Sequence, residues 1–313
     1  MVLQQGKPIA VFGEAEGPVE AAPGPVRAAA DSQDGRFLVH LPPMEAGGPY
    51  TLTLRWGRRR SPWGRTMLRR PAGPYETMLS RVAPFTLRGF LYDQGEQDAA
   101  LPWAGGYAAV FAALIAQWRR LFMDDTLFSA AAQLPRFGAE PSAEDWPAIR
   151  AAQQAVADGT DNAALACLLD CGERDNVHPA DKQTPGQRLA ALALAHVYGQ
   201  NVPADAPRLA EASLSGGRLT LTFTGTGGSL RAQGNAQSAF LVEGAQLQGA
   251  AVTGSRCILD LRDAGSCVRV RYGQANWPEA ILAGESGLPV FPFNMTVRSE
   301  APQAEQPAAS TGS

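Results

Sequence analysis

The sequence has few of the residues that metal sites and disulfide scaffolds require. Its 313 residues include only four cysteines and three histidines, and no two cysteines stand at C-x-x-C spacing. Structural zinc sites and small disulfide frameworks need such residues in paired, closely spaced sets. We therefore expect no metal and no cofactor. Buried thiols are the expected state of Cys167, Cys171, Cys257 and Cys267, with a disulfide between Cys257 and Cys267 as the alternative.

Long apolar runs and an excess of positive charge are also lacking. The most apolar stretch, residues 107–122, is interrupted by Gln117, Arg119 and Arg120 and is too short to span a bilayer. Residues 1–8 have no basic start followed by an apolar core, so they predict no signal peptide. The net charge of -3 gives no attraction to nucleic acid or anionic membranes. We expect neither as a partner; compartment and oligomeric state stay open.

The chain does contain a clear order of structural patterns. In residues 1–54, apolar and polar residues alternate in short runs on both sides of an Asp-Gly turn, which predicts a small antiparallel β module. Residues 75–202 alternate strand and helix, a β-α-β-α-β-α series that right-handed crossovers turn into a parallel sheet covered by helices. Residues 203–298 predict a second β module, and residues 299–313 a disordered tail. Residues 55–74 form an arginine-rich junction with neither a helical nor a strand period. If this junction is functional, it would be a basic patch that binds an acidic polymer.

Two loops carry polar residues directly after predicted strands. Residues 92–98 read Tyr-Asp-Gln-Gly-Glu-Gln-Asp, and residues 170–179 contain Asp175 and His178. Ligands of a parallel sheet meet the loops at the carboxyl ends of its strands. A carboxylate three residues before a histidine can hold the imidazole tautomer while the other ring nitrogen takes a proton. His178 is therefore the candidate base, with a structural role as the alternative; His40 and His196 are expected to be solvated or hydrogen-bonded.

Both loops resemble sequence blocks of the sialate O-acetylesterase family. Residues 92–98 are similar to its Trp-Tyr-Gln-Gly-Glu-Ser-Asn block, and residues 170–182 to its Asp-Ile-Gly-Glu…Ile-His-Pro-x-x-Lys block. Further similar segments follow in the same order at residues 1–8, 41–52, 83–85, 133–135, 186–190, 287–289 and 292–293. The resemblance covers most of the chain.

The resemblance implies an α/β fold: a three-layer, parallel-sheet, SGNH-like hydrolase domain, incomplete here and flanked by β modules. It implies removal of O-acetyl groups from sialic acid or related acetylated carbohydrates by a serine that His178 activates, with Asp175 as its partner. The loop of Gln94, Gly95 and Glu96 would shape the oxyanion environment, with Gln94 as donor. Glu96 has the alternative role of a structural carboxylate bonded to backbone. A periplasmic or secreted setting is also implied.

The family's nucleophile turn, Gly-Gln-Ser-Asn-Met, is not found in the sequence. Ser61 precedes a proline in the junction and Ser80 precedes the 83–85 segment, so neither replaces it. Asp98 stands where the family has Asn, and its carboxylate would oppose a forming oxyanion. Losing the nucleophile predicts activity lower by several orders of magnitude.

The loss of the nucleophile block has two further consequences. The strand that precedes the turn would be missing too, which predicts exposed strand edges and loose packing. The alternative identities are a noncatalytic carbohydrate-binding protein and an inactive gene fragment, in which the 55–74 junction is translated out of frame.

Overall fold

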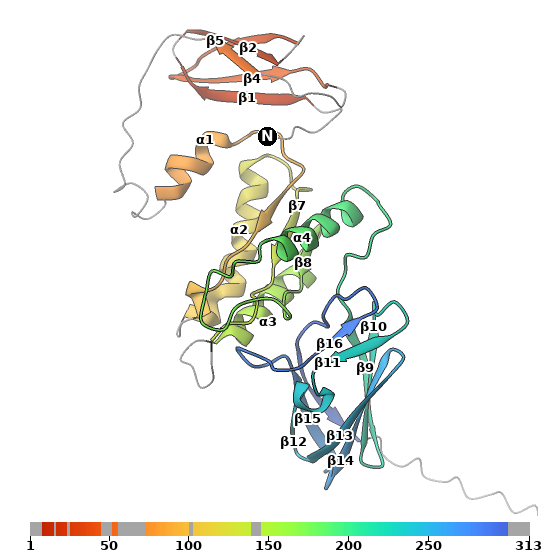
Figure 1. The fold of residues 1–313 in the computed structure, drawn as a ribbon. Coiled ribbons are helices and arrows are strands. Elements are labelled where there is room, and N and C mark those ends of the chain that lie inside the picture. Colours follow the sequence, from red (N-terminus) through yellow and green to blue (C-terminus); the bar gives the residue numbers. More distant parts are fainter. Residues whose placement is uncertain are drawn as a thin grey trace, which may run out of the picture. The chain divides into compact units, whose positions relative to one another are not determined.

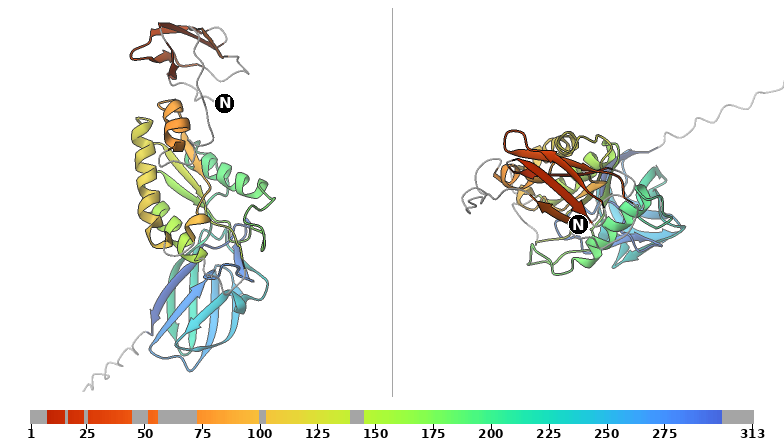
Figure 2. Two further views of the ribbon diagram at one scale, coloured as in Figure 1. Left: turned by 90° about the vertical axis from the view of Figure 1, so that its left-hand side faces the viewer. Right: turned by 90° about the horizontal axis from the view of Figure 1, so that it is seen from above.

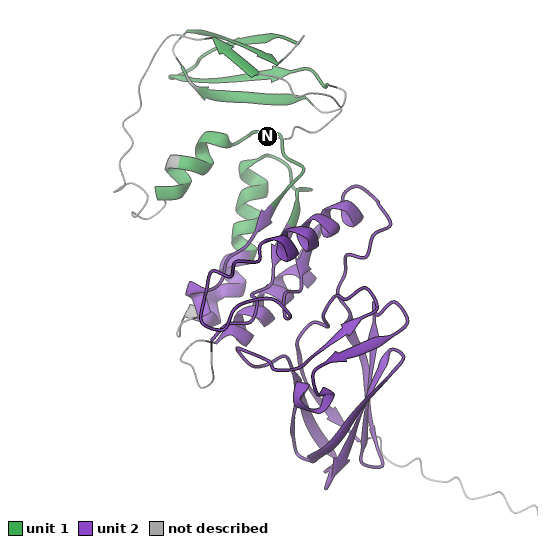
Figure 3. Cartoon of the chain, viewed as in Figure 1, with its two compact units in different colours: residues 1–90, 112–129 green, residues 91–111, 130–313 purple. Residues whose placement is uncertain are grey.

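The computed structural model describes residues 8–15, 17–23, 26–44, 52–55, 73–99, 103–138 and 145–299. They divide into two compact units, residues 1–90 with 112–129 and residues 91–111 with 130–313 (Figure 3). Nearly all of the predicted 55–74 junction, Ser61 included, and of the 299–313 tail lies outside the described residues.

The first β module follows the alternation of its sequence. Its strands are β1 (Ile9–Glu14), β2 (Pro18–Pro23), β3 (Ala28–Asp31), β4 (Arg36–Leu41) and β5 (Leu52–Arg55). Strand β1 pairs antiparallel with β4, and the second sheet has the order β3-β2-β5. Phe37, Val39 and Leu41 alternate into the core. The predicted turn is confirmed, since Asp34 and Gly35 have φ of 51° and 74°, which suits a tight hairpin turn.

A helical segment follows that the sequence pattern did not predict. It comprises η2 (Tyr75–Leu79) and α1 (Ser80–Val82), and it ends where Ala83 turns extended before Pro84. The next strand is shorter than predicted, Gly89–Tyr92 instead of residues 85–92. Pro84 offers no N–H, and the Thr86 hydroxyl donates to the Pro8 carbonyl at 3.0 Å, so residues 85–87 stay irregular.

The alternation of strand and helix in the middle of the chain is confirmed (Figure 1). The elements are β6 (Gly89–Tyr92), η3 (Gln97–Ala99), η4 (Trp103–Gly106), α2 (Tyr107–Leu121), β7 (Phe128–Ala132), α3 (Trp146–Asp158), β8 (Ala163–Ala166) and α4 (Gln183–His196). The strands form a parallel sheet of order β6-β7-β8. Every residue of β7 is buried, as expected for its central place. Helices α3 and α4 both pack on β8.

Local chemistry explains these helices. Asp145 caps α3 by accepting the Ala148 N–H at 2.9 Å, with a proline in the first turn. On α2 the apolar spacing buries Phe111 and Ile115, whose exposed fractions are 3% and 2%, but Val110 is 70% exposed. The pattern had placed Val110 on the buried face of this helix. Tyr92 of β6 stacks on Phe111 with ring centres 4.9 Å apart.

The second β module contains the strands after α4. They are β9 (Arg208–Ser215), β10 (Arg218–Thr224), β11 (Leu230–Gln233), β12 (Phe240–Glu243), β13 (Gln246–Thr253), β14 (Arg256–Arg262), β15 (Cys267–Tyr272), β16 (Ile281–Gly284) and β17 (Phe293–Arg298), with η5 (Ala236–Ala239) between β11 and β12. They form the sheets β13-β14-β10-β9, β12-β15-β17 and β11-β16. Figure 2 shows the strands of this module in cyan and blue. Phe293 links the two larger sheets, because the centre of its ring lies 6.0 Å from that of Phe223 and 5.3 Å from that of Tyr272. The predicted module is therefore a β-sandwich.

All four cysteines are free thiols, so the alternative of a Cys257–Cys267 disulfide is wrong. Cys257 lies in the sandwich core with no exposed surface, whereas Cys267 begins β15 in an exposed position. Among the described residues, no helix is both long and apolar enough to cross a bilayer.

Candidate functional site

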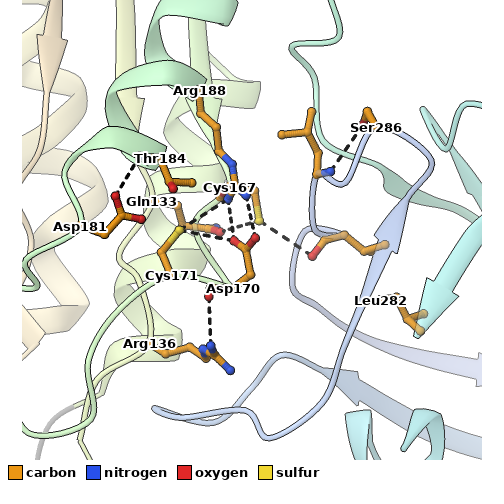
Figure 4. Close-up of polar contacts among 12 residues, drawn as sticks. Gln133, Arg136, Cys167, Asp170, Cys171, Asp181, Thr184, Arg188, Leu282 and Ser286 are labelled. Carbon is orange, nitrogen blue, oxygen red and sulfur yellow. Dashed lines mark hydrogen bonds and ion pairs between the residues drawn. The ribbon is translucent and has the colours of Figure 1, made fainter. Parts of the chain in front are cut away.

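An ion pair fixes the start of the loop that carries His178. Arg188 of α4 grips the Asp170 carboxylate with both terminal nitrogens, at 2.5 and 2.6 Å, and also donates to the Cys167 carbonyl at 2.7 Å (Figure 4). Burial by itself would lower the pKa of Arg188, but the hydrogen bonds and charge of Asp170 outweigh it and raise that pKa. The pair ties the end of β8 to α4.

The two cysteines beside this pair are poor nucleophiles. Burial raises the pKa of the Cys167 thiol to about 12. The pKa of Cys171 is also raised to about 12, by burial first and then by the neighbouring Asp170 carboxylate. Because the thiolate is the reactive form, both thiols are unreactive near neutral pH.

A single carboxylate shapes the loop around His178. Glu173 accepts the Ala180 N–H at 2.6 Å and the Asn176 side-chain amide at 2.9 Å, and the Asn176 carbonyl oxygen in turn accepts the His178 N–H at 3.0 Å. These hydrogen bonds, Ala180 first, lower the pKa of Glu173. Sequence reasoning missed Glu173, although it belongs to the family-like block. The available signal was its place in that block, directly after Gly172.

The carboxyl end of this loop is held in the same way. Asp181, one residue before the N-cap Lys182, accepts the N–H groups of Gln183 and Thr184 at 2.9 and 3.1 Å and so satisfies donors in the first turn of α4. The side-chain and backbone hydrogen bonds of Thr184 lower the pKa of Asp181. His178 therefore lies on a short loop anchored by carboxylates at both ends.

The imidazole of His178 is exposed to solvent, and so is Asp175. Within the described loop, no hydrogen bond joins their side chains, and the role of Asp175 in orienting His178 stays a prediction. His40 is exposed on β4. His196 pairs with Asp205 at 2.9 Å, which is the hydrogen-bonded role expected for it.

The Gln94 side chain is engaged at both ends. Its oxygen accepts the Tyr92 hydroxyl at 2.8 Å, and its amide nitrogen donates to the Asp98 carboxylate at 2.5 Å. One of its two amide N–H groups is thus committed to Asp98. An oxyanion donor role for Gln94 relies on the other. Burial, and then the carboxylate of Asp98, raises the pKa of Tyr92.

The backbone of the same loop is packed from behind. The Gln94 carbonyl accepts the Tyr107 hydroxyl at 2.9 Å and the Gln153 amide at 3.0 Å. Gly95 is buried with φ of 148°, and a side-chain carbon there would lie 2.9 Å from Ile149. Only glycine fits this position without strain. Glu96 uses its carbonyl to accept the Ala99 N–H at 3.3 Å, and within the described residues its carboxylate bonds no backbone group.

Buried Arg150 holds the loop after β7 against the second β module. It donates to the carbonyls of Leu134, Pro135, Ala275 and Asn276 at 2.7–3.0 Å. Burial lowers its pKa to about 10. Nearby, Arg136 lies 4.6 Å from the centre of the Trp277 ring and donates to the Asp170 carbonyl at 3.0 Å. These arginines had no signal in the sequence, because only the fold brings their acceptors together.

The site is therefore two loops that leave strands of one parallel sheet. The Gln94 loop follows β6 and the His178 loop follows β8, with β7 between these strands. Across the described residues, no group of three or more His, Cys, Asp or Glu side chains is arranged to hold a metal ion. The Ser80 hydroxyl donates to the Glu76 carbonyl at 3.0 Å within its helix.

The comparisons with known proteins identify a fold. A search of family models and a search of curated proteins each found no match. Among solved structures, the chain is similar to a carbohydrate acetylesterase from Xanthomonas citri with a TM-score of 0.77 and 22% identity. The match covers 94% of this chain and 96% of that one. The chain therefore has the fold of a carbohydrate esterase.

Proposed function

We propose that this protein is a sialate O-acetylesterase-like hydrolase of SGNH type that acts on acetylated carbohydrates and turns over slowly. The observation that carries this proposal is the match, along nearly the whole chain, to the fold of a carbohydrate acetylesterase. The exposed His178, on a loop anchored after β8, supports it, because that is where a parallel sheet presents its catalytic groups.

His178 supplies the general base in this proposal. Without the family's serine, the imidazole takes a proton from water as the oxygen adds to the acetyl carbonyl. The tetrahedral intermediate then expels the sugar oxygen, which receives the proton from His178, and the products are acetate and the free hydroxyl group. In this proposal the second amide N–H of Gln94 donates to the developing oxyanion. This route lacks a covalent intermediate, so we expect slow turnover without a burst.

The test measures acetate released from 9-O-acetylated N-acetylneuraminic acid and from 4-nitrophenyl acetate. The His178→Ala variant removes the base, and His196→Ala is the matched control because His196, at the end of α4, pairs with Asp205. We expect turnover that is lost in His178→Ala and kept in His196→Ala. Equal rates in both variants would refute the role of His178.

A noncatalytic carbohydrate-binding protein is the second candidate. The hydrogen bond from the Gln94 amide to the Asp98 carboxylate favours this candidate, because a carboxylate beside the donor disfavours a forming anion. Calorimetric titration with acetylated and deacetylated sialic acid separates the two candidates. Binding without acetate release supports this second function, and a folded sample that neither binds nor hydrolyses excludes both.

A further inference from the structure

We propose that the first unit carries a separate binding site for a neutral saccharide. A cleft of about 770 Å³ lies there between the β module and the helical segment at residues 73–82. That volume falls in the range of roughly 300–1,000 Å³ typical of small-ligand sites. All lining residues belong to one compact unit, and none belongs to the Gln94 or His178 loop.

Contacts between the two sides hold the base of this cleft. Phe12 of β1 meets the edge of Phe85 with ring centres 6.5 Å apart. The Thr86 hydroxyl donates to the Pro8 carbonyl at 3.0 Å. The segment that follows the helix is thereby fixed to the edge of the β module, and the walls of the cleft have a defined base.

The floor of the cleft contains apolar groups. Phe12, Gly13 and Phe37 contribute to it, and the Phe37 ring lies against Gly13 so closely that a side-chain carbon at Gly13 would be 2.9 Å from it. Any side chain at Gly13 would displace the ring from this floor. The half-buried Phe12 ring is the aromatic surface open to the C–H face of a sugar ring, because Phe37 is only 6% exposed and belongs to the core of the module.

The rim of the cleft is polar and balanced in charge. Asp31 and Glu76 supply two carboxylates, Arg36 and Arg81 two guanidinium groups, and Gln33 an amide. Two negative and two positive charges cancel, which disfavours a phosphate, a polyanion or a cationic peptide. Acceptors and donors side by side are what the hydroxyl groups of a neutral sugar require, because each hydroxyl both donates and accepts.

The experiment is a calorimetric titration of the full chain with cellohexaose, xylohexaose and hexa-N-acetylchitohexaose. We expect at least one to bind with a Kd of about 1 mM or tighter. The double variant Gln33→Ala, Arg36→Gln, both positions being exposed, is expected to weaken binding about tenfold. Arg27→Gln is the matched control, since Arg27 pairs with Glu20 on the same module outside the cleft, and it is expected to bind normally.

Three results with the unaltered chain and the double variant would overturn the proposal. They are no heat with any of the three neutral hexasaccharides, unchanged affinity in the double variant, and tighter binding of hexagalacturonate than of the neutral sugars. His178→Ala is included to keep this site distinct from the proposed catalytic one. Unchanged affinity there supports a separate site whatever the chain hydrolyses, whereas lost affinity would refute it.

Discussion

The two strand-end loops of the candidate site are held in opposite ways. The Gln94 loop is packed from behind by Tyr107 and Gln153, and its own side chains bond one another. The His178 loop is fixed at its ends by Asp170 and Asp181, while its middle is exposed. The first loop is therefore held by packing and by its own hydrogen bonds, whereas the second presents His178 to solvent.

Breaking the anchor of the His178 loop should have the largest effect. Arg188→Leu leaves Asp170 largely buried without its partner, which we expect to lower the free energy of unfolding by about 3–5 kcal/mol. Urea denaturation measures it. Arg218→Leu is the matched control, because its pair with Asp260 is 64% and 58% exposed and is worth about 0–1 kcal/mol. Similar losses of unfolding free energy in both variants would mean that the Asp170 pair stabilises the chain no more than an exposed pair does.

A change of backbone geometry tests the rigid loop. Gly95→Ala forces a side chain into a φ of 148° and against Ile149, which we expect to cost about 1–3 kcal/mol of stability. Gly186→Ala on α4 is the control, and its expected effect on stability has the opposite sign. Nothing lies near its missing side chain, so alanine should stabilise the helix by about 0.5–1 kcal/mol. A neutral result at Gly95 would contradict the packing described for this loop.

The hydroxyl of Tyr107 tests the same loop more gently. Tyr107→Phe removes the donor to the Gln94 carbonyl and should cost about 1–2 kcal/mol, measured by thermal or urea unfolding. Because burial raises the pKa of Tyr107, its hydroxyl stays protonated and the effect should not change between pH 6 and 9. Tyr198→Phe, at a 63% exposed position, should be neutral. A pH-dependent loss would argue against this hydrogen bond.

Much of this arrangement could be read from the sequence, and the reasons are local. Alternation predicted β4, β10 and β15, because each presents one buried face to a single core. The 3.6-residue period predicted α2, although Val110 is exposed, since the period cannot tell which neighbours cover a helix. The location of His178 after a buried strand was also readable.

The parts that could not be predicted depend on long-range contacts. Arg150 bonds carbonyls more than a hundred residues away, at Ala275 and Asn276, and no local pattern announces such a partner. The bond between Gln94 and Asp98 is close in sequence, but its direction depends on how η3 turns after Gly95. Roles inferred from a family-like block thus locate a loop and leave its hydrogen bonding open.

The smallest expected effect is confined to the exposed loop. The pKa of Glu173 is lowered below its ordinary 4.5 by the Ala180 N–H and the Asn176 amide. A lowered pKa means that the carboxylate orders the loop fully above pH 4.5 and that this order is lost as the pH falls through the folded-state value. We expect the amide protons of Ala180 and His178 to exchange faster over that range, with global stability nearly unchanged. Glu173→Gln should show the fast exchange at neutral pH, whereas Glu211→Gln, at an exposed position on β9, should not. If Glu173→Gln instead unfolds the chain, the two loops are equally structural and the contrast between them fails.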